Sequence, residues 1–122
     1  MNDLNISDVR VFVPARDFAL SKAFYSALGW TEQWTSDDLA LLEVAGQRFY
    51  LQNYYNKDWA ENFMMHISVE NAQDCYLRVR KVMDSGQFPG TRIKAPEQQP
   101  YGALVAHAWD PSGVLLHFCE WI

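Results

Sequence analysis

Apolar and polar residues alternate in the segment Asp8–Val13, and a helical spacing of apolar residues follows it. The three valines of this segment share one parity, which predicts a β-strand that turns them toward helices. Asp17 is a suitable N-cap, and apolar residues at spacings of two to four predict a helix that runs to about Leu28. Gly29 then occupies the position at which helices commonly end.

Three short extended stretches come next along the chain. We place strands near Thr31–Thr35, Leu39–Val44 and Gln47–Tyr54, with Ala45-Gly46 as the turn between the last two. The polar stretch from Asn56 to Asn62 is interpreted as a connection. The first part of the chain therefore has the order βαβββ.

The same order begins again at the alternating segment Met64–Val69, which predicts a strand. Asn71 caps a predicted helix that stops at Ser85-Gly86. Arg10 and His66 occupy equivalent places, which sets the two units 56 positions apart and indicates a duplicated unit. The remaining extended stretches are Arg92–Lys94, Ala103–Trp109 and Val114–Trp121.

Length and composition support one domain. A chain of 122 residues, 49% hydrophobic and 15% aromatic, can bury one substantial core. We predict a single α+β domain over residues 1–122. It consists of two tandem βαβββ modules, about 1–58 and 59–122, that form an open U-shaped mixed sheet with helices on its outer face.

Charge and cysteine usage narrow the range of partners. Ten Lys and Arg against fifteen Asp and Glu give a net charge of −5, and the scattered basic residues predict no nucleic-acid partner. The first residues carry acids where a signal peptide has bases, and no apolar run approaches about 20 residues. We therefore expect a cytoplasmic protein with no membrane partner. Cys75 and Cys119 lack zinc-motif and CxxC spacing and are interpreted as buried thiols.

Four local patterns resemble the vicinal oxygen chelate superfamily, which includes glyoxalase I, bleomycin-resistance proteins, extradiol dioxygenases and fosfomycin-resistance transferases. The resemblance implies an open sheet, often completed as a dimer, around a cavity that binds a metal or another ligand. The Asp-Pro-Ser-Gly turn is similar to the family's Asp-Pro-Asp-Gly turn. The patterns are Val13–Tyr25 with Asp17 seven residues before Phe24-Tyr25, then Leu28-Gly29-Trp30, then Met65–Val69, and finally Tyr101-Gly102 followed by Trp109–Gly113.

In metal-dependent members of the superfamily, four inward residues on the first and last strands of the modules hold a divalent ion. The resemblance places Arg10, Gln52, His66 and His117 at these positions. Strand parity agrees independently, because Gln52 shares a face with two tyrosines and His66 shares one with Ser68. The two histidines have a second interpretation as hydrogen-bonded core residues.

This residue set disfavours a metal cofactor. A catalytic divalent ion needs three or more His or carboxylate ligands, and Arg10 is a permanent cation that does not coordinate. Only His66 and His117 qualify, and they are the fallback ligands. A register slip of two residues would put Asp8 in place of Arg10 and restore a carboxylate. His107 is a reserve ligand on a strand that the family does not use.

Aromatic residues complete the predicted cavity. We favour a metal-free binding protein, resembling bleomycin-resistance proteins, that sequesters a small anionic or aromatic molecule in a cleft of a homodimer. A dimer is expected because an open sheet leaves strand edges that are normally covered. The alternative is a lyase or isomerase of the glyoxalase I type that depends on a divalent metal such as Zn, Ni or Fe. The aromatic candidates for ligand contact are Tyr54, Trp59, Tyr101 and Trp109.

Overall fold

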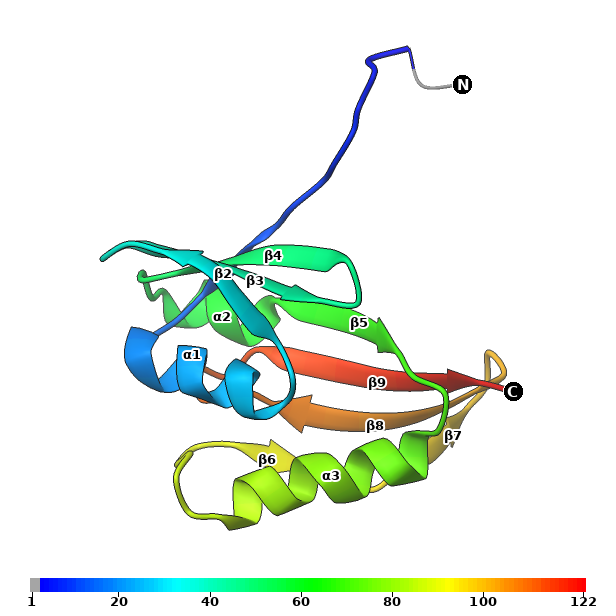
Figure 1. Cartoon of the computed structure of the whole chain (residues 1–122). Coiled ribbons are helices and arrows are strands. Elements are labelled where there is room, and N and C mark those ends of the chain that lie inside the picture. Colours follow the sequence, from blue (N-terminus) through cyan, green and yellow to red (C-terminus); the bar gives the residue numbers. More distant parts are fainter. Residues whose placement is uncertain (1–2) are drawn as a thin grey trace.

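The computed structural model describes residues 3–122 and contains two open mixed sheets (Figure 1). In each sheet the first strand of a module runs parallel to the last, and the other pairings are antiparallel. The α+β prediction with two βαβββ modules is confirmed, and each module forms its own sheet. Module one pairs its strands in the order β1 (Phe12–Pro14), β4 (Gln47–Gln52), β3 (Leu39–Val44), β2 (Thr31–Thr35). Module two has the order β5 (Met64–Ser68), β9 (Leu115–Trp121), β8 (Ala103–Trp109), β6 (Arg92–Ile93), and β7 (Glu97–Gln99) also pairs with β8.

The two long helices begin where their caps predict. Asp17 accepts a hydrogen bond from the backbone of Leu20 at the start of α1 (Phe18–Ala27). Asn71 does the same for Asp74 at the start of α3 (Ala72–Asp84). Both side chains satisfy amide groups that the first helical turn leaves unpaired.

The connection between the modules is a helix, which the sequence analysis did not predict. α2 (Lys57–Asn62) begins at Asn56, whose side-chain oxygen accepts from the amide of Trp59 at 3.0 Å. The polar composition of this segment favoured a loop in the prediction, because only one face of such a short helix contacts the rest of the protein. None of the three helices in the described part of the chain is long and apolar enough to cross a membrane.

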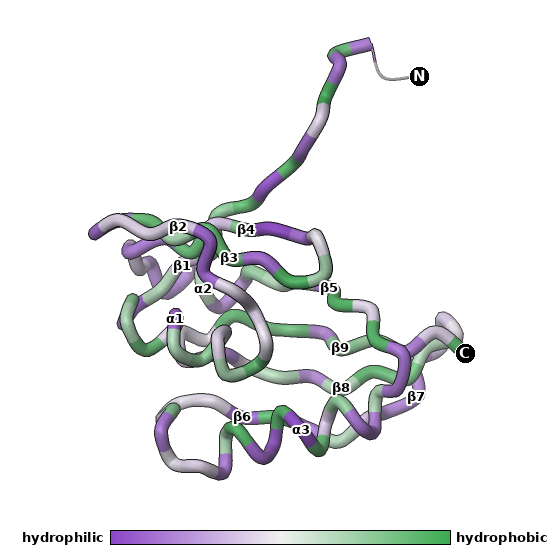
Figure 2. The backbone as a smooth tube through the Cα atoms, in the orientation of Figure 1, coloured by the Kyte–Doolittle hydropathy of each residue, from purple (hydrophilic) through white to green (hydrophobic). Residues whose placement is uncertain are grey.

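The first strand is shorter than the alternation predicts. Val9 and Val11 are 76% and 46% exposed, and only Val13 is buried against the helices. Pairing with β4 begins where the amide of Tyr50 donates to the carbonyl of Val11, so the preceding residues have no strand beside them there. Residues 3–11, the N-terminal arm, run away from the body of the molecule, with apolar and polar residues mixed along them (Figures 1 and 2).

Both modules contribute to one hydrophobic core on the helix side of the sheets. Phe24 of α1 makes an edge contact with Phe88, which follows α3, at 5.5 Å between ring centroids. Tyr25 packs edge-on against Trp30 and Phe49. Because the side of each sheet that faces the helices is buried in this common core, the opposite sides form two open faces on the outside of the molecule. Other buried members are Val13, Leu51, Val79, Ala106, Leu116 and Phe118.

The turn before β9 joins the two modules through buried polar contacts. The hydroxyl of Tyr25 donates to Asp110 Oδ2 at 2.7 Å, and both residues are fully buried. The backbone amides of Ser112 and Val114 donate to Asp110 Oδ1 at 2.8 and 3.0 Å. Burial raises the pKa of Asp110, and these hydrogen bonds act against that rise. Ser112 Oγ in turn accepts from the amide of Arg16 in module one.

Candidate binding site

A row of three histidines crosses the open face of module two. His66 on β5 is paired with His117 on β9, and His117 is paired with His107 on β8. Strand alternation puts all three side chains on the face away from the helices, as parity predicted for His66 and His117. We call His66, His117 and His107 the imidazole row. We expected His107 only as a reserve ligand, yet its ring centroid lies 4.8 Å from that of His117.

Two members of the imidazole row, His66 and the central His117, have further partners. The Nε2 atom of His66 lies 2.8 Å from Ser68 Oγ, and its ring lies 5.6 Å from that of Trp121. The Nε2 atom of His117 lies 3.5 Å from the sulfur of Met64. Burial lowers the pKa of His117, and the charges of His107 and His66 lower it further, so its neutral form is favoured at pH 7.

An arginine stacked on a tryptophan borders the imidazole row. Arg92 on β6 is paired with Trp109 on β8, and its guanidinium carbon lies 3.8 Å from the centroid of the indole ring. This is a cation–π contact. Among the described residues, no salt bridge engages Arg92, so its charge is available to a ligand. Sequence reasoning did not single out Arg92; its place on a strand paired with Trp109 was the available signal. Tyr101 lies near Trp121, at 6.1 Å between centroids.

The open face of module one carries a different group. Phe12 and Tyr50 stack with centroids 5.0 Å apart, and Arg10 donates to the hydroxyl of Tyr50 at 2.8 Å. Arg10 also forms an ion pair with Asp8. Gln52 is two residues along β4 from Tyr50 and lies on the same face. Asp8 is therefore an ion-pair partner of Arg10 in the N-terminal arm. The alternative register required Asp8 as a ligand beside His66 and His117 instead.

Tyr54 and Trp59 form a separate aromatic pair beyond the end of β4. Their centroids lie 6.0 Å apart, and Trp59 contacts Phe63 at 6.4 Å. Tyr54 is 54% exposed. These two predicted ligand contacts therefore group around α2, whereas Tyr101 and Trp109 belong to module two.

The four inward residues form two pairs within this chain. Among residues 3–122, no hydrogen bond, ion pair or ring contact joins Arg10 or Gln52 to His66 or His117. The pairs lie on separate sheets whose open faces are both on the outside.

These residues do not fit the divalent ion that the superfamily resemblance implies. The guanidinium of Arg10 is already bound to Tyr50 and Asp8, and a cation at a ligand position opposes a second cation. Within the described part of the chain, no three His, Cys, Asp or Glu side chains are grouped to hold a metal ion.

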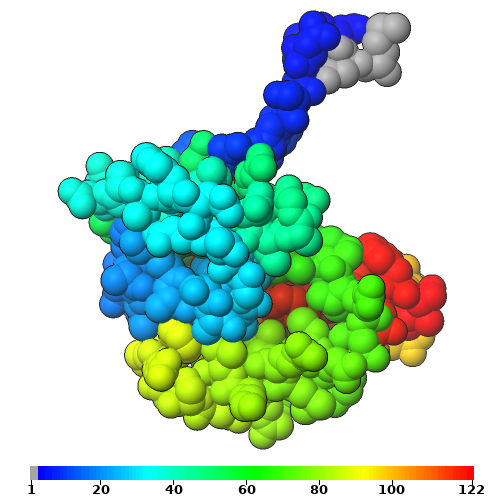
Figure 3. Space-filling view, in the orientation of Figure 1, coloured from blue at the N-terminus to red at the C-terminus, as the bar shows by residue number. Residues whose placement is uncertain are grey.

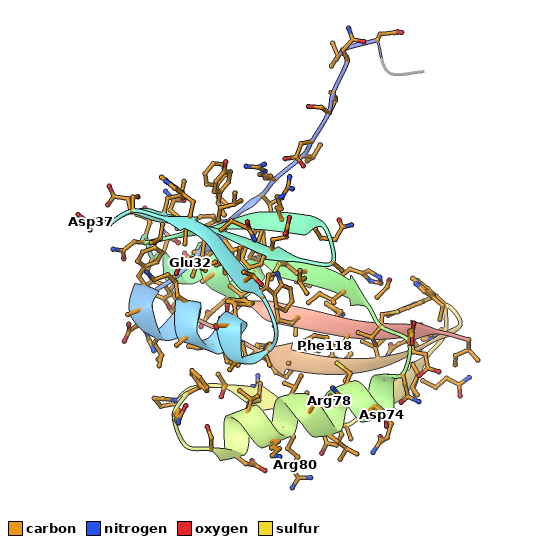
Figure 4. All side chains as sticks on the ribbon, in the orientation of Figure 1. Glu32, Asp37, Asp74, Arg78, Arg80 and Phe118 are labelled. Atoms are coloured by element: carbon orange, nitrogen blue, oxygen red, sulfur yellow. The ribbon has the colours of Figure 1, made fainter. Side chains whose placement is uncertain are left out.

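A groove of about 1140 Å³ lies on the helix side, between the end of α1, β5 and α3. Figure 3 shows β9 atoms, in red, at the floor of a hollow there, and Figure 4 shows Asp74 and Arg78 on α3 near Phe118. His66 lines its edge, but Arg10, Gln52 and His117 do not line it, so it is distinct from the predicted cavity. Its apolar lining includes Leu28, Trp30, Phe49, Met65, Ile67 and Phe118.

Comparisons with known proteins agree with this architecture. The family model described as Glyoxalase/Bleomycin resistance protein/Dioxygenase superfamily matches residues 9–118. A bleomycin-binding protein solved in complex with bleomycin aligns with a TM-score of 0.76 and 22% identity, over 94% of this chain and 98% of that one. A bleomycin resistance determinant encoded on the transposon Tn5 has a TM-score of 0.76 and 25% identity, over 93% and 98%. The bleomycin-binding protein of Streptomyces verticillus, complexed with copper(II)-bleomycin, has a TM-score of 0.75 and 19% identity, over 93% and 96%. No curated protein matches the sequence.

Proposed function

Because the chain belongs to the Glyoxalase/Bleomycin resistance protein/Dioxygenase superfamily, we propose that it is a metal-free binding protein for small planar anions. The ligand stacks on Trp109 and pairs with Arg92, and His66 and His117 hydrogen-bond its polar edge. The protein sequesters this ligand without transforming it.

One observation carries the proposal. The open face of module two combines an uncompensated guanidinium, an indole ring and the imidazole row within one small area. Aromatic walls with a few convergent polar groups are typical of small-molecule sites. Two of the similar solved structures contain bleomycin or copper(II)-bleomycin, which supports binding as a use of this fold.

Two tricyclic probes of opposite charge test the ligand class. Quenching of tryptophan fluorescence is measured with anthracene-9-carboxylate and with 9-aminoacridine, which have similar ring systems. We expect tighter binding of the carboxylate. Arg92→Gln should weaken it about five-fold, because an exposed ion pair contributes up to about 1 kcal/mol.

Arg80→Gln is the matched control. Arg80 also lies over an aromatic ring, that of Tyr76 at 6.0 Å, but on the outer surface of α3. Its replacement should leave binding of the carboxylate unchanged. Equal binding of the two probes, or equal effects of the two arginine variants, would contradict the proposed site.

The metal-free part of the proposal has its own test. Elemental analysis of the purified protein should find no stoichiometric divalent ion. A bound divalent ion that is lost in His66→Ala would instead support chemistry of the glyoxalase I type, and methylglyoxal turnover with glutathione would then be expected.

We also infer that the binding unit is a homodimer. A monomer leaves large apolar side chains exposed on module one and in the arm, and it keeps Arg10 and Gln52 apart from His66 and His117. Pairing of the open faces of two copies would cover the exposed apolar side chains. It would also bring Arg10 and Gln52 of one copy near His66 and His117 of the other. Light scattering should give twice 14.1 kDa, and a stable monomer at micromolar concentration would overturn the inference. The exposed apolar residues include Val9, Val11, Phe12 and Trp34.

A further inference from the structure

A set of soft donor atoms lies on the open face of module two, at one end of the imidazole row. We propose that Met64, His107 and His117 bind one cuprous ion, Cu(I), through one sulfur and two nitrogen atoms. We call these three residues the copper site. This site goes beyond the proposed function, whose metal-free part concerns a divalent ion. It shares His117 with the proposed ligand site, and its test needs no organic ligand.

Three strands bring the donors together. Met64 is on β5, one diagonal step from His117 on β9, and His107 is directly opposite His117 on β8. Alternation gives all three the same face of the sheet. The sheet therefore fixes the spacing of the three backbones, and small side-chain rotations adjust only the donor atoms.

One distance between donor atoms matches that around a bound ion. The Nε2 atom of His117 lies 3.5 Å from the sulfur of Met64. With metal–nitrogen and metal–sulfur bonds of about 2.0 and about 2.3 Å, as zinc has, one ion between these atoms would subtend an angle of about 110°. His107 supplies the third donor from the adjacent strand, where its ring makes an edge contact with His117 at 4.8 Å between centroids.

The donor chemistry selects copper in its monovalent state. Imidazole suits zinc, copper, iron and nickel, whereas a thioether is a soft ligand that favours Cu(I). No carboxylate belongs to the set, so a hard divalent ion gains no charge compensation. The guanidinium of Arg92 is stacked on Trp109, two residues along β8 from His107, and it opposes a doubly charged ion more than a singly charged one.

The three donors are accessible and free of strong competing partners. The side chain of Met64 is 60% exposed, which is unusual for a methionine and leaves its sulfur open to an ion. His117 and His107 are partly buried.

The two cysteines are the competing soft donors. Cys119 is 1% exposed and is paired with Val105, on the same face of β9 as His117, and Cys75 is half-buried on α3. Burial raises the pKa of Cys75 to about 11, which disfavours the thiolate that copper requires. A Cys75→Ser, Cys119→Ser variant removes both from the measurement.

Anaerobic titration against a chromophoric Cu(I) chelator tests the site, with Cu(I) alone as the probe. We expect one ion per chain in the native protein and in the double cysteine variant. Met64→Leu, His107→Asn and His117→Asn should each weaken binding at least about ten-fold. Met65→Leu is the matched control, because Met65 lies on the helix-facing side of the same strand, and its affinity should equal the native one.

X-ray absorption at the copper edge identifies the donors directly. Copper–sulfur scattering should be present in the double cysteine variant and absent when Met64→Leu is added to it. Loss of Cu(I) binding in the double cysteine variant would overturn the proposal, because the thiols would then be the ligands. Equal affinity of Met64→Leu and Met65→Leu would overturn it as well.

Discussion

Replacing Tyr25 by phenylalanine should destabilise the protein by removing one hydrogen bond between the modules. The ring contacts of Tyr25 with Phe24, Trp30 and Phe49 are retained in the variant, so only the O–H that donates to Asp110 is lost. Both partners are fully buried, and water has no access to replace the hydroxyl. A hydrogen bond to a charged group contributes about 1.5–3 kcal/mol, so we expect the free energy of unfolding to fall by about 2 kcal/mol at pH 7. For a domain of this size the melting temperature should drop by about 8 °C.

The pH dependence separates this explanation from a packing defect. Burial holds the pKa of Asp110 above its usual value, and the hydroxyl of Tyr25 lowers it again, so the variant should have the higher pKa. An acid with a raised pKa in the folded state binds its proton more tightly there, and its ionisation therefore opposes folding. The difference in unfolding free energy between the native protein and the variant should be largest above the folded-state pKa of Asp110 in the variant. This deficit should shrink as the pH falls through the folded-state pKa values of Asp110 in the two proteins.

Urea unfolding of the native protein and of Tyr25→Phe at a series of pH values measures the effect. Tyr76→Phe is the control, because its hydroxyl contacts Arg80 on the exposed side of α3 and its removal should change stability by less than about 0.5 kcal/mol. A deficit in Tyr25→Phe as small as that of the control, or one that grows on acidification, would refute the reasoning.

Three further predictions concern the open face and the turns. The NMR titration of His117 should have its midpoint below pH 6.5, and His107→Gln should raise that midpoint. Because the pKa of His117 is lower in the folded state than in the unfolded state, its protonation reduces the stability of the fold as the pH falls below about 6.5. A midpoint at or above pH 6.5 would contradict the effects of burial and of the neighbouring charges. An anion beside His117 should raise the pKa of this histidine, so binding of anthracene-9-carboxylate should take up protons and tighten from pH 7 to pH 5.5. Calorimetry in two buffers of different ionisation enthalpy measures the proton uptake, and proton release would argue against an anion site. Ala45→Gly should stabilise the protein by about 0.5–1 kcal/mol, because Ala45 has φ 50° in the β3–β4 turn, where glycine has no steric penalty; an unchanged urea midpoint would show that the turn relaxes instead.

Local signals in the sequence predicted most of the elements. The caps Asp17 and Asn71 and the turn at Ala45-Gly46 involve only residues close to them in the chain. Their effect therefore does not depend on the tertiary structure and can be predicted from the sequence. Asn56 gave the same kind of signal for α2, but the polar residues after it favoured a loop. Local pattern alone therefore identifies helices well where an apolar face accompanies the cap.

Alternation failed where a neighbouring strand was needed. The arm has the pattern of a strand through Val9 and Val11, yet a strand forms only where β4 lies beside it. Parity correctly placed His66 and His117 on one face, because alternation is a local property. Their separation from Arg10 and Gln52, and the alignment of His107 with them, depend on how sheets and registers assemble, which no single segment encodes.

The common core has a consequence for the duplicated plan of the chain. Phe24 and Tyr25 of module one bury their rings and hydroxyl against Phe88 and Asp110 of module two, so neither half can complete its interior by itself. A chain divided within α2 should give two fragments that stay unfolded apart and regain structure when mixed. Two modules of similar plan therefore behave as a single cooperative unit, in which a core substitution in one module also destabilises the other.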